Sequence, residues 1–167
     1  APAVPAAQPR LVLAPSGPVT GENYASSPRP SSLHAVESPI TYQDTAHVKT
    51  QYNQAFTPLS TGKFDDAESA FTSFIKENET HPLTGNAYYW LGESYYVQKH
   101  YEQAAIQFLR GYQKFPKGTK GPDNILKLAM TLTHLNKHKQ ACVSFSKLLS
   151  EFPSAPNAIR QRAETEM

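Results

Sequence analysis

The feature that most constrains this chain is an internal repeat of 37 residues in its second half. Ala67, Ala104 and Ala141 are separated by that interval, and a phenylalanine follows each of them four residues later. Repetition at a fixed period of about 20 to 50 residues is typical of stacked structural units. One such unit cannot bury its apolar face alone, so the copies must cover one another in an array.

The middle copy shows the residue pattern most clearly. Large aromatics, small residues, leucine and proline recur in it at helical spacing, at positions Tyr88, Leu91, Gly92, Tyr95, Tyr101, Ala104, Phe108 and Pro116. This order matches the tetratricopeptide repeat (TPR), in which two antiparallel helices approach closely at small residues and aromatics fill the space beside them. The usual TPR period is about 34 residues, so we expect the additional residues in the loops between repeats.

The sequence therefore predicts an all-α TPR-type helical solenoid over residues 46–167, made of three helix pairs and a C-terminal capping helix. The paired helices are expected near 46–61, 64–78, 83–98, 101–114, 122–135 and 138–151. They form repeats at about 46–82, 83–119 and 120–155, and the capping helix is expected at 156–166. Its polar outer face suits a cap, because a solenoid must hide its last apolar surface.

Residues 1–45 have a different composition. They contain most of the chain's 14 prolines, together with Ser, Ala and Gly, and they show no sustained apolar period. Proline removes a backbone donor and disfavours helix in the residue before it. With few large apolar residues to bury, we predict that this segment is a disordered, flexible Pro-rich linker.

Composition excludes several classes of function. The formal net charge of +2 gives no electrostatic argument for binding to nucleic acid, and no apolar run is long enough to insert into a membrane. The one cysteine, Cys142, cannot form an internal disulfide, and its apolar helical surroundings predict a buried side chain.

Catalytic and cofactor motifs are also missing from the sequence. The eight glycines are scattered, so no glycine-rich phosphate loop is formed. His134 and His138 are four residues apart, but a predicted turn separates them and no third ligand accompanies them. Lys114, Lys117 and Lys120 are interpreted as a solvated basic loop between repeats. We therefore predict no enzymatic activity, no metal and no cofactor.

The stretch from Tyr52 to about Ala163 resembles the C-terminal TPR domain of the Tol-Pal-associated family called YbgF or CpoB. The resemblance rests on YNQAFTPLSTGKFDDAESAF, on NAYYWLGESYYVQKHYEQAAIQF, and on the inter-repeat segments HPLTGNA and FPKGTKGPDN. It implies a periplasmic adaptor that binds TolA and a peptidoglycan synthase complex. Such an adaptor helps to coordinate outer-membrane constriction with peptidoglycan synthesis during cell division.

The family usually trimerises through a coiled coil that precedes the linker, but no heptad run occurs here before residue 45. We therefore expect this chain to be monomeric, with trimerisation left to a coiled coil that this sequence lacks. The alternative function is a TPR scaffold subunit of another bacterial envelope assembly, for example one that inserts outer-membrane proteins. An acylated cysteine near the N-terminus would favour that alternative, and none precedes Cys142.

Partner binding is expected on the concave face, which the first helix of each TPR pair lines. Counting outward from the packing residues selects one side of each such helix. The predicted binding residues are Tyr52, Asn53, Phe56, Asn86, Tyr89, Glu93, Tyr96, Lys127, Met130 and His134. Their aromatic, amide and thioether groups suit a docked helix or extended peptide held by apolar anchors and a few hydrogen bonds.

Overall fold

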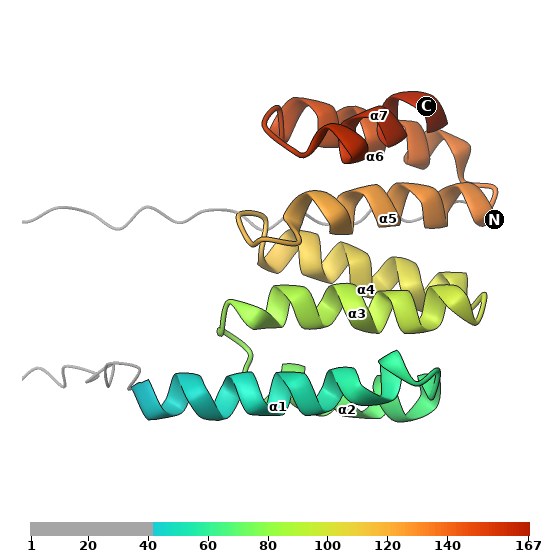
Figure 1. The fold of residues 1–167 in the computed structure, drawn as a ribbon. Coiled ribbons are helices and arrows are strands. Elements are labelled where there is room, and N and C mark those ends of the chain that lie inside the picture. The colour runs from blue at the N-terminus through green and yellow to red at the C-terminus, as the bar shows by residue number, and fades with distance from the viewer. Residues whose placement is uncertain (1–41) are drawn as a thin grey trace, which may run out of the picture. The chain divides into compact units, whose positions relative to one another are not determined.

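The computed structural model describes residues 42–167, and within this range the chain forms seven α-helices and no strand (Figure 1). The helices are α1 (Tyr42–Ser60), α2 (Phe64–Glu77), α3 (Leu83–Val97), α4 (Tyr101–Lys114), α5 (Gly121–His134), α6 (His138–Glu151) and α7 (Asn157–Glu166). The predicted all-α fold of three helix pairs and a final helix is confirmed. The predicted linker at residues 1–45 lies outside the described residues, apart from its last four positions.

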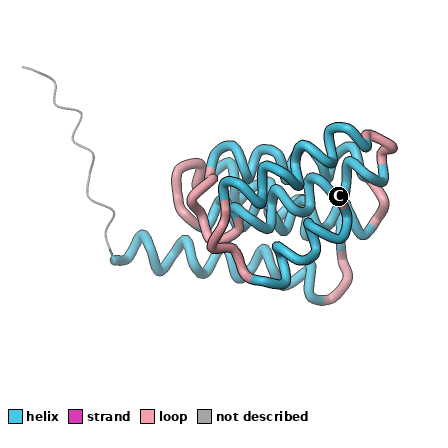
Figure 2. The backbone as a smooth tube through the Cα atoms, turned by 90° about the horizontal axis from the view of Figure 1, so that it is seen from above, coloured by secondary structure: helices cyan, strands magenta, loops and turns pink. Residues whose placement is uncertain are grey.

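Those last four positions are helical, so the expected start of the first helix at residue 46 is wrong. α1 begins at Tyr42, and its amino-terminal part extends beyond the other helices in Figure 2. His47, Lys49 and Thr50 on this part are exposed. The additional turn of α1 has few apolar side chains to bury, which is why the apolar pattern of the sequence does not reveal it.

Each helix pair is closed by a three-residue turn whose middle residue has the same conformation in all three repeats. Gly62, Lys99 and Asn136 are 37 residues apart and have φ angles of 73°, 62° and 58°. This left-handed region ends a helix and reverses the chain at once. The segments between pairs are longer, at residues 78–82, 115–120 and 152–156, so the extra length of the repeat lies there as expected.

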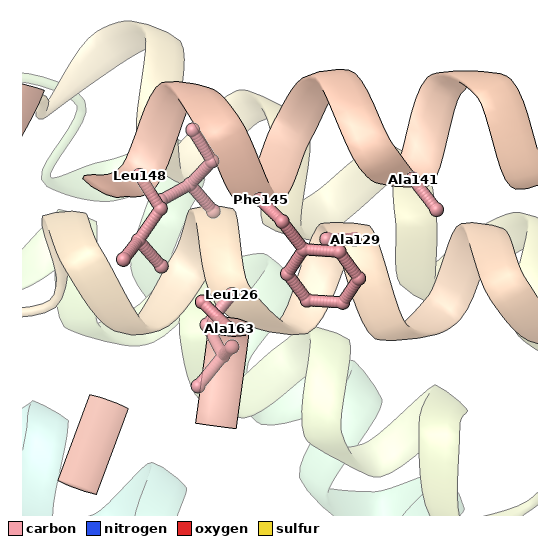
Figure 3. Packing of buried hydrophobic residues seen from close by; sticks show 7 residues of the cluster. Leu126, Ala129, Ala141, Phe145, Leu148 and Ala163 are labelled. Carbon is pink, nitrogen blue, oxygen red and sulfur yellow. The ribbon is translucent and has the colours of Figure 1, made fainter. Parts of the chain in front are cut away.

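The core consists of one apolar cluster per repeat, each built around a phenylalanine of the second helix. Phe71, Phe108 and Phe145 are completely buried. In the third repeat, Phe145 and Leu148 of α6 pack with residues of α5 and with Ala163 of α7, as Figure 3 shows. α7 therefore covers the last apolar surface of the stack, as expected for a cap.

Small residues set the distance between the paired helices. A Cβ atom at Gly92 would lie 2.5 Å from the ring of Phe108, so α3 and α4 approach more closely there than an alanine allows. The equivalent positions in the first and third repeats are Ala55 and Ala129, both buried against the corresponding clusters. The middle pair thus has the tightest contact at this position.

The predicted burial of Cys142 is wrong, because its side chain is exposed. The buried stripe of α6 runs through Ala141, Phe145 and Leu148. Cys142 is one residue beyond Ala141, which turns its side chain about 100° around the helix and out of that stripe. Its Sγ lies 3.6 Å from the carbonyl oxygen of Met167.

Candidate partner-binding face

The first helices of the pairs form a continuous row. The backbone of α1 approaches that of α3, α3 approaches α5, and α5 approaches α7, whereas among residues 42–167 the backbones of α2, α4 and α6 do not approach one another. Figure 1 shows α1, α3 and α5 following one another along the stack, with α2 behind α1 and with α6 next to α7 at the C-terminal end. Because the first helices lie closer together, the stack curves with this row on its inner side. We call the surface of α1, α3 and α5 that carries the predicted residues the inner face.

An aromatic cluster joins α1 to α3 on the inner face. The ring of Trp90 lies edge-on to Phe56 at 5.0 Å and to Tyr89 at 4.9 Å between centroids. The hydroxyl of Tyr52 is within hydrogen-bonding reach of Trp90 and Asn86. Burial raises the pKa of Tyr52, and those two hydrogen bonds offset part of the rise. The cluster therefore presents flat apolar surface beside neutral hydrogen-bonding groups.

Lys120 lies over this cluster, although the sequence suggested that it belongs to a solvated loop. Its Nζ is 4.6 Å from the centroid of the Tyr89 ring and 5.6 Å from that of Trp90. The same ammonium donates to Asp123 Oδ1 at 3.0 Å. An ammonium over an aromatic face is attracted by the ring quadrupole, so these contacts hold the lysine against the inner face.

A second group of contacts joins α3 to α5. Lys127 forms an ion pair of 2.8 Å with Glu93, and its Nζ lies 4.5 Å from the centroid of the Tyr96 ring. The Tyr96 hydroxyl and His134 Nε2 are 2.9 Å apart, and the His134 ring stacks on Tyr101 at 4.5 Å with an interplanar angle of 4°. These contacts fix the polar half of the inner face.

Burial also raises the pKa of two tyrosines on the inner face. For Tyr89 the largest cause is desolvation, followed by the negative charges of Glu93 and Asp123. For Tyr96 it is again desolvation, followed by Tyr101 and Glu93. Both hydroxyls stay protonated at neutral pH, so they can donate hydrogen bonds but carry no charge.

The predicted residues differ in how much surface they offer. Asn53 and His134 are exposed, and Asn86 is half-buried and accepts a hydrogen bond from Thr119 at 2.9 Å. By contrast, Tyr89 is only 9% exposed and packs on Phe108. Tyr52 and Met130 are partly buried against the apolar clusters of their repeats. These last three contribute much of their side chain to packing.

Three residues of the inner face were missed by counting along the sequence. Trp90 lies four residues after Asn86, and a helical stripe includes the i+4 position as well as i+3, so the signal was present. Lys120 and Tyr101 lie at the starts of helices, and their place on this face depends on how the repeats stack. No sequence pattern indicates those two contacts.

Taken as a surface, the inner face carries aromatic and amide groups with little free charge. Both of its lysines are matched, Lys120 by Asp123 and Lys127 by Glu93. Aromatic side chains beside satisfied polar groups are typical of binding hot spots for a helix or an extended peptide. The described residues contain no group of three or more side chains that could ligate a metal ion. In residues 42–167 no helix has the length and apolar character needed to cross a membrane.

Comparison with protein families identifies the repeat. Two models described as tetratricopeptide repeat match the chain, one at residues 59–121 and the other at residues 123–155. Together they cover more than half of the sequence, and they span α2 to α6 with the loops between them.

Among characterised proteins, the chain is similar to the cell division coordinator CpoB of Pseudomonas putida. The identity is 40% over 50 residues, which is 30% of this chain. The match covers 19% of the length of that relative, so it relates one segment and not the two whole proteins.

Solved structures share the fold at low sequence identity. PcrH from Pseudomonas aeruginosa aligns with a TM-score of 0.62 at 20% identity, over 72% of this chain and 89% of PcrH. The Yersinia enterocolitica chaperone SycD, in complex with a peptide of the translocator YopD, gives 0.62 at 15% identity over 75% and 96%. The N-terminal domain of STI-1 from C. elegans gives 0.62 at 11% identity over 73% and 95%. At these identities the likeness concerns the helical stack alone.

Proposed function

The chain belongs to the tetratricopeptide-repeat family, and on that premise we propose that it is a periplasmic adaptor of the Tol-Pal system. In this role it binds TolA and a peptidoglycan synthase complex and helps to coordinate outer-membrane constriction with peptidoglycan synthesis during cell division. The observation that carries the proposal is the 40% identity over 50 residues with the cell division coordinator CpoB.

The inner face supports the binding part of the proposal. It combines an aromatic cluster around Trp90 with a polar group around Tyr96, and both are held in place by contacts between repeats. A surface that is ordered before binding loses less conformational entropy when a partner docks. We assign the TolA contact to this face, with the predicted residues and Trp90 as its anchors.

A role without catalysis fits the same surface. The tyrosines with raised pKa values are protonated at neutral pH, and the acids Glu93 and Asp123 are each paired with a lysine. A nucleophile or general base must be available to react, and none of these groups is. The inner face is suited to holding another protein.

The test is isothermal titration calorimetry of the 167-residue chain with a purified periplasmic fragment of TolA. The variant is Tyr96→Ala together with His134→Ala, since these two side chains meet on the inner face. Tyr96 is only partly buried, at the edge of the apolar cluster around Phe108, whereas Tyr89 is one of the buried members of that cluster. Tyr89 is left intact because it packs on Phe108. We expect the double variant to weaken binding by at least about tenfold.

The matched control is Arg110→Ala, an exposed residue of α4, which is not one of the helices that form the inner face. It should bind the TolA fragment as the wild type does. If the wild type and the inner-face variant bind the TolA fragment with equal affinity, and circular dichroism shows unchanged helix content, TolA binds outside the inner face. Absence of heat with the wild type would remove TolA as the partner.

A further inference from the structure

A hollow lies on the outer side of the stack, away from the inner face. It is formed between α4 and α6, with α5 as its floor, and has a volume of about 520 Å³. We call it the outer groove. Its lining is mainly apolar and consists of Glu102, Ala105, Ile106, Leu109, Leu128, Leu132, Leu135, Lys137, Gln140 and Ser144.

The preceding gap in the stack, between α2 and α4, shows what is unusual about the outer groove. There, Gln98 donates to Glu68 at 2.6 Å, and Tyr95 also hydrogen-bonds Glu68. Polar side chains thus occupy that gap and satisfy one another. Such a filled gap offers no apolar surface to another protein.

One repeat further along, the equivalents of those three polar residues are all apolar. Ala105 replaces the glutamate, Leu132 the tyrosine and Leu135 the glutamine, each 37 residues later. Leucine is smaller than tyrosine and makes no hydrogen bond, so the position fills less space and binds no water. Of the two gaps between second helices in residues 42–167, it is therefore the one between α4 and α6 that has an apolar floor.

The side chains that form the walls of the outer groove are also more apolar than their equivalents one repeat earlier. Ser69 and Thr72 on α2 correspond to Ile106 and Leu109 on α4, which are 47% and 39% exposed. On α6, Val143 is 66% exposed beside the lining residues Gln140 and Ser144. Large apolar side chains exposed together on one face indicate an interaction surface.

This face carries both a projection and a hollow. Val143 stands out from α6 at the same repeat position that Ile106 occupies on α4, and in the sequence it lies between the lining residues Gln140 and Ser144. A surface with a projecting side chain beside a hollow can pair with a copy of itself. In a two-fold interface each copy supplies both the projecting side chain and the hollow that receives the other one. With a volume of about 520 Å³, the hollow can take a projecting residue together with neighbouring side chains of the same helix.

The charged residues at the mouth of the outer groove are also complementary to those of a second copy. Glu102 and Lys137 both line it, at the amino-terminal ends of α4 and α6. Neither side chain forms an ion pair within residues 42–167, so each is available to an outside charge. An acid and a base on one face are complementary to the same face of a second copy.

We propose that the outer groove binds a second copy of this chain, about a two-fold axis that runs along α4 and α6. Such an axis keeps the helices of the two copies parallel, so their amino-terminal ends meet at one level. Val143 of each copy then enters the hollow of the other, and Glu102 faces Lys137 of the second copy. This dimer leaves the inner face free and does not depend on the proposed function.

The association is weak. Standard stable interfaces bury about 1,600 Å² in total, whereas this contact joins only two helices of each copy around a shallow hollow. The chain is then monomeric at low concentration, as the sequence predicts, and dimerises as concentration rises. Full-length proteins held close to one another by other contacts would favour the dimer through their high effective concentration.

The first experiment is sedimentation velocity of the 167-residue chain over a wide concentration range, extending to about the millimolar level at which weak pairs form. The test variant carries Ile106→Ser and Leu109→Thr, the residues that the fold already tolerates at the equivalent positions Ser69 and Thr72. We expect the dissociation constant of the dimer to rise at least about tenfold, since four apolar side chains are lost per dimer. Circular dichroism checks that the variant is folded.

The second experiment uses charge reversal. Glu102→Lys and Lys137→Glu should each weaken the dimer by a few-fold, because each places like charges opposite one another. When the two single variants are mixed, both contacts of the heterodimer regain opposite charges, so association should return to about the wild-type strength. This recovery is specific to an interface in which these two residues face each other across copies.

Four results would overturn the proposal. The wild type could remain monomeric at every concentration, or its self-association could survive Ile106→Ser with Leu109→Thr. Mixing the charge-reversed variants could also fail to restore association. Binding of a helix from another protein to the groove of a strictly monomeric chain would likewise assign it a different occupant.

Discussion

The carboxylate of Glu93 on α3 and the ammonium of Lys127 on α5 lie 2.8 Å apart, in an ion pair that joins two successive repeats. Both side chains are largely withdrawn from solvent, at 18% and 21% exposed. Because the pair crosses the boundary between repeats, it contributes to stacking and not to the stability of one helix pair. Its strength can be measured separately from that of the core.

Replacing Glu93 by Gln leaves the Lys127 ammonium without its anion in a partly buried position. We expect the free energy of unfolding to fall by about 1–2 kcal/mol. A double-mutant cycle with Lys127→Met, followed by urea unfolding, should give a coupling energy of about 1 kcal/mol. Strictly additive effects of the two substitutions would mean that the pair does not stabilise the stack.

Gly92→Ala should destabilise the protein even though alanine occurs at the equivalent positions of the other repeats. The new Cβ would meet the buried ring of Phe108 at 2.5 Å, and overpacking of this kind costs about 1–3 kcal/mol. The gain in helix propensity, about 1 kcal/mol, offsets only part of that. Thermal unfolding measures the net loss. The control is Ala129→Gly, which should lower stability through lost helix propensity and the loss of a buried methyl group. An increase in stability for Gly92→Ala would contradict the close approach.

Lys99→Gly should stabilise the protein. Lys99 has a φ of 62°, a conformation that costs a residue with a side chain about 1–2 kcal/mol and costs glycine almost nothing. After the greater chain entropy of unfolded glycine is subtracted, we expect a gain of up to about 1 kcal/mol. The matched control is Gly62→Ala, at the same position of the first repeat, which should lose stability. Chemical denaturation of both variants tests the shared turn geometry.

Trp90 is the only tryptophan in the chain, so its fluorescence reports on the inner face without interference. Phe56→Ala removes a ring that lies 5.0 Å away and opens the indole to water. We expect the emission maximum to move to longer wavelength. Val97→Ala on the same helix is the control, since Val97 is exposed and absent from the cluster around Trp90. Unchanged emission in Phe56→Ala would mean that the two rings do not shield each other in solution.

Acidification should weaken the fold through His81. Its Nδ1 accepts the backbone N–H of Leu83 at 3.1 Å at the start of α3, which requires the unprotonated nitrogen. Burial, assisted by the charge of Lys49, lowers the pKa of His81 in the folded protein. The unfolded chain therefore binds more protons as the pH falls through about 6.5, and stability decreases below that value.

The loss is expected to be below about 1 kcal/mol, because His81 is only partly buried. His81→Asn keeps an acceptor at this helix start but cannot titrate, so its stability should change less between pH 7.5 and pH 5. Urea unfolding of both proteins at the two pH values makes the comparison. Identical pH dependence would show that His81 is not the titrating group.

The fold was largely predictable because its determinants are local and repeated. The recurrence of Ala67, Ala104 and Ala141 fixes the helix pairs, and the phenylalanines that follow them fix the core. The first turn of α1 was not predictable, since residues 42–45 continue no apolar period in the sequence. Cys142 shows where prediction of burial from the sequence fails. Apolar neighbours in the sequence do not decide on which side of a helix a residue lies.

The inner face was predictable only in part. Helical spacing selects the side of α3 and α5 that carries Tyr96 and His134, but it does not say how deeply Tyr89 packs on Phe108. That depth depends on the distance between α3 and α4, which Gly92 sets. The position of Lys120 over an aromatic cluster of the preceding repeat depends on the stacking of two repeats, and no periodicity encodes it.

The unequal spacing of first and second helices also determines how the stack responds to force. Bending that changes the gaps between α2, α4 and α6 must also shift α2 against α3 and α4 against α5, because these backbones pack on each other as well. The row α1, α3, α5 and α7 lies on the inner side of the stack, so its helices are expected to move least relative to one another. We therefore expect a change in curvature to be spread over small shifts at every junction between repeats, while the contacts within each helix pair stay intact.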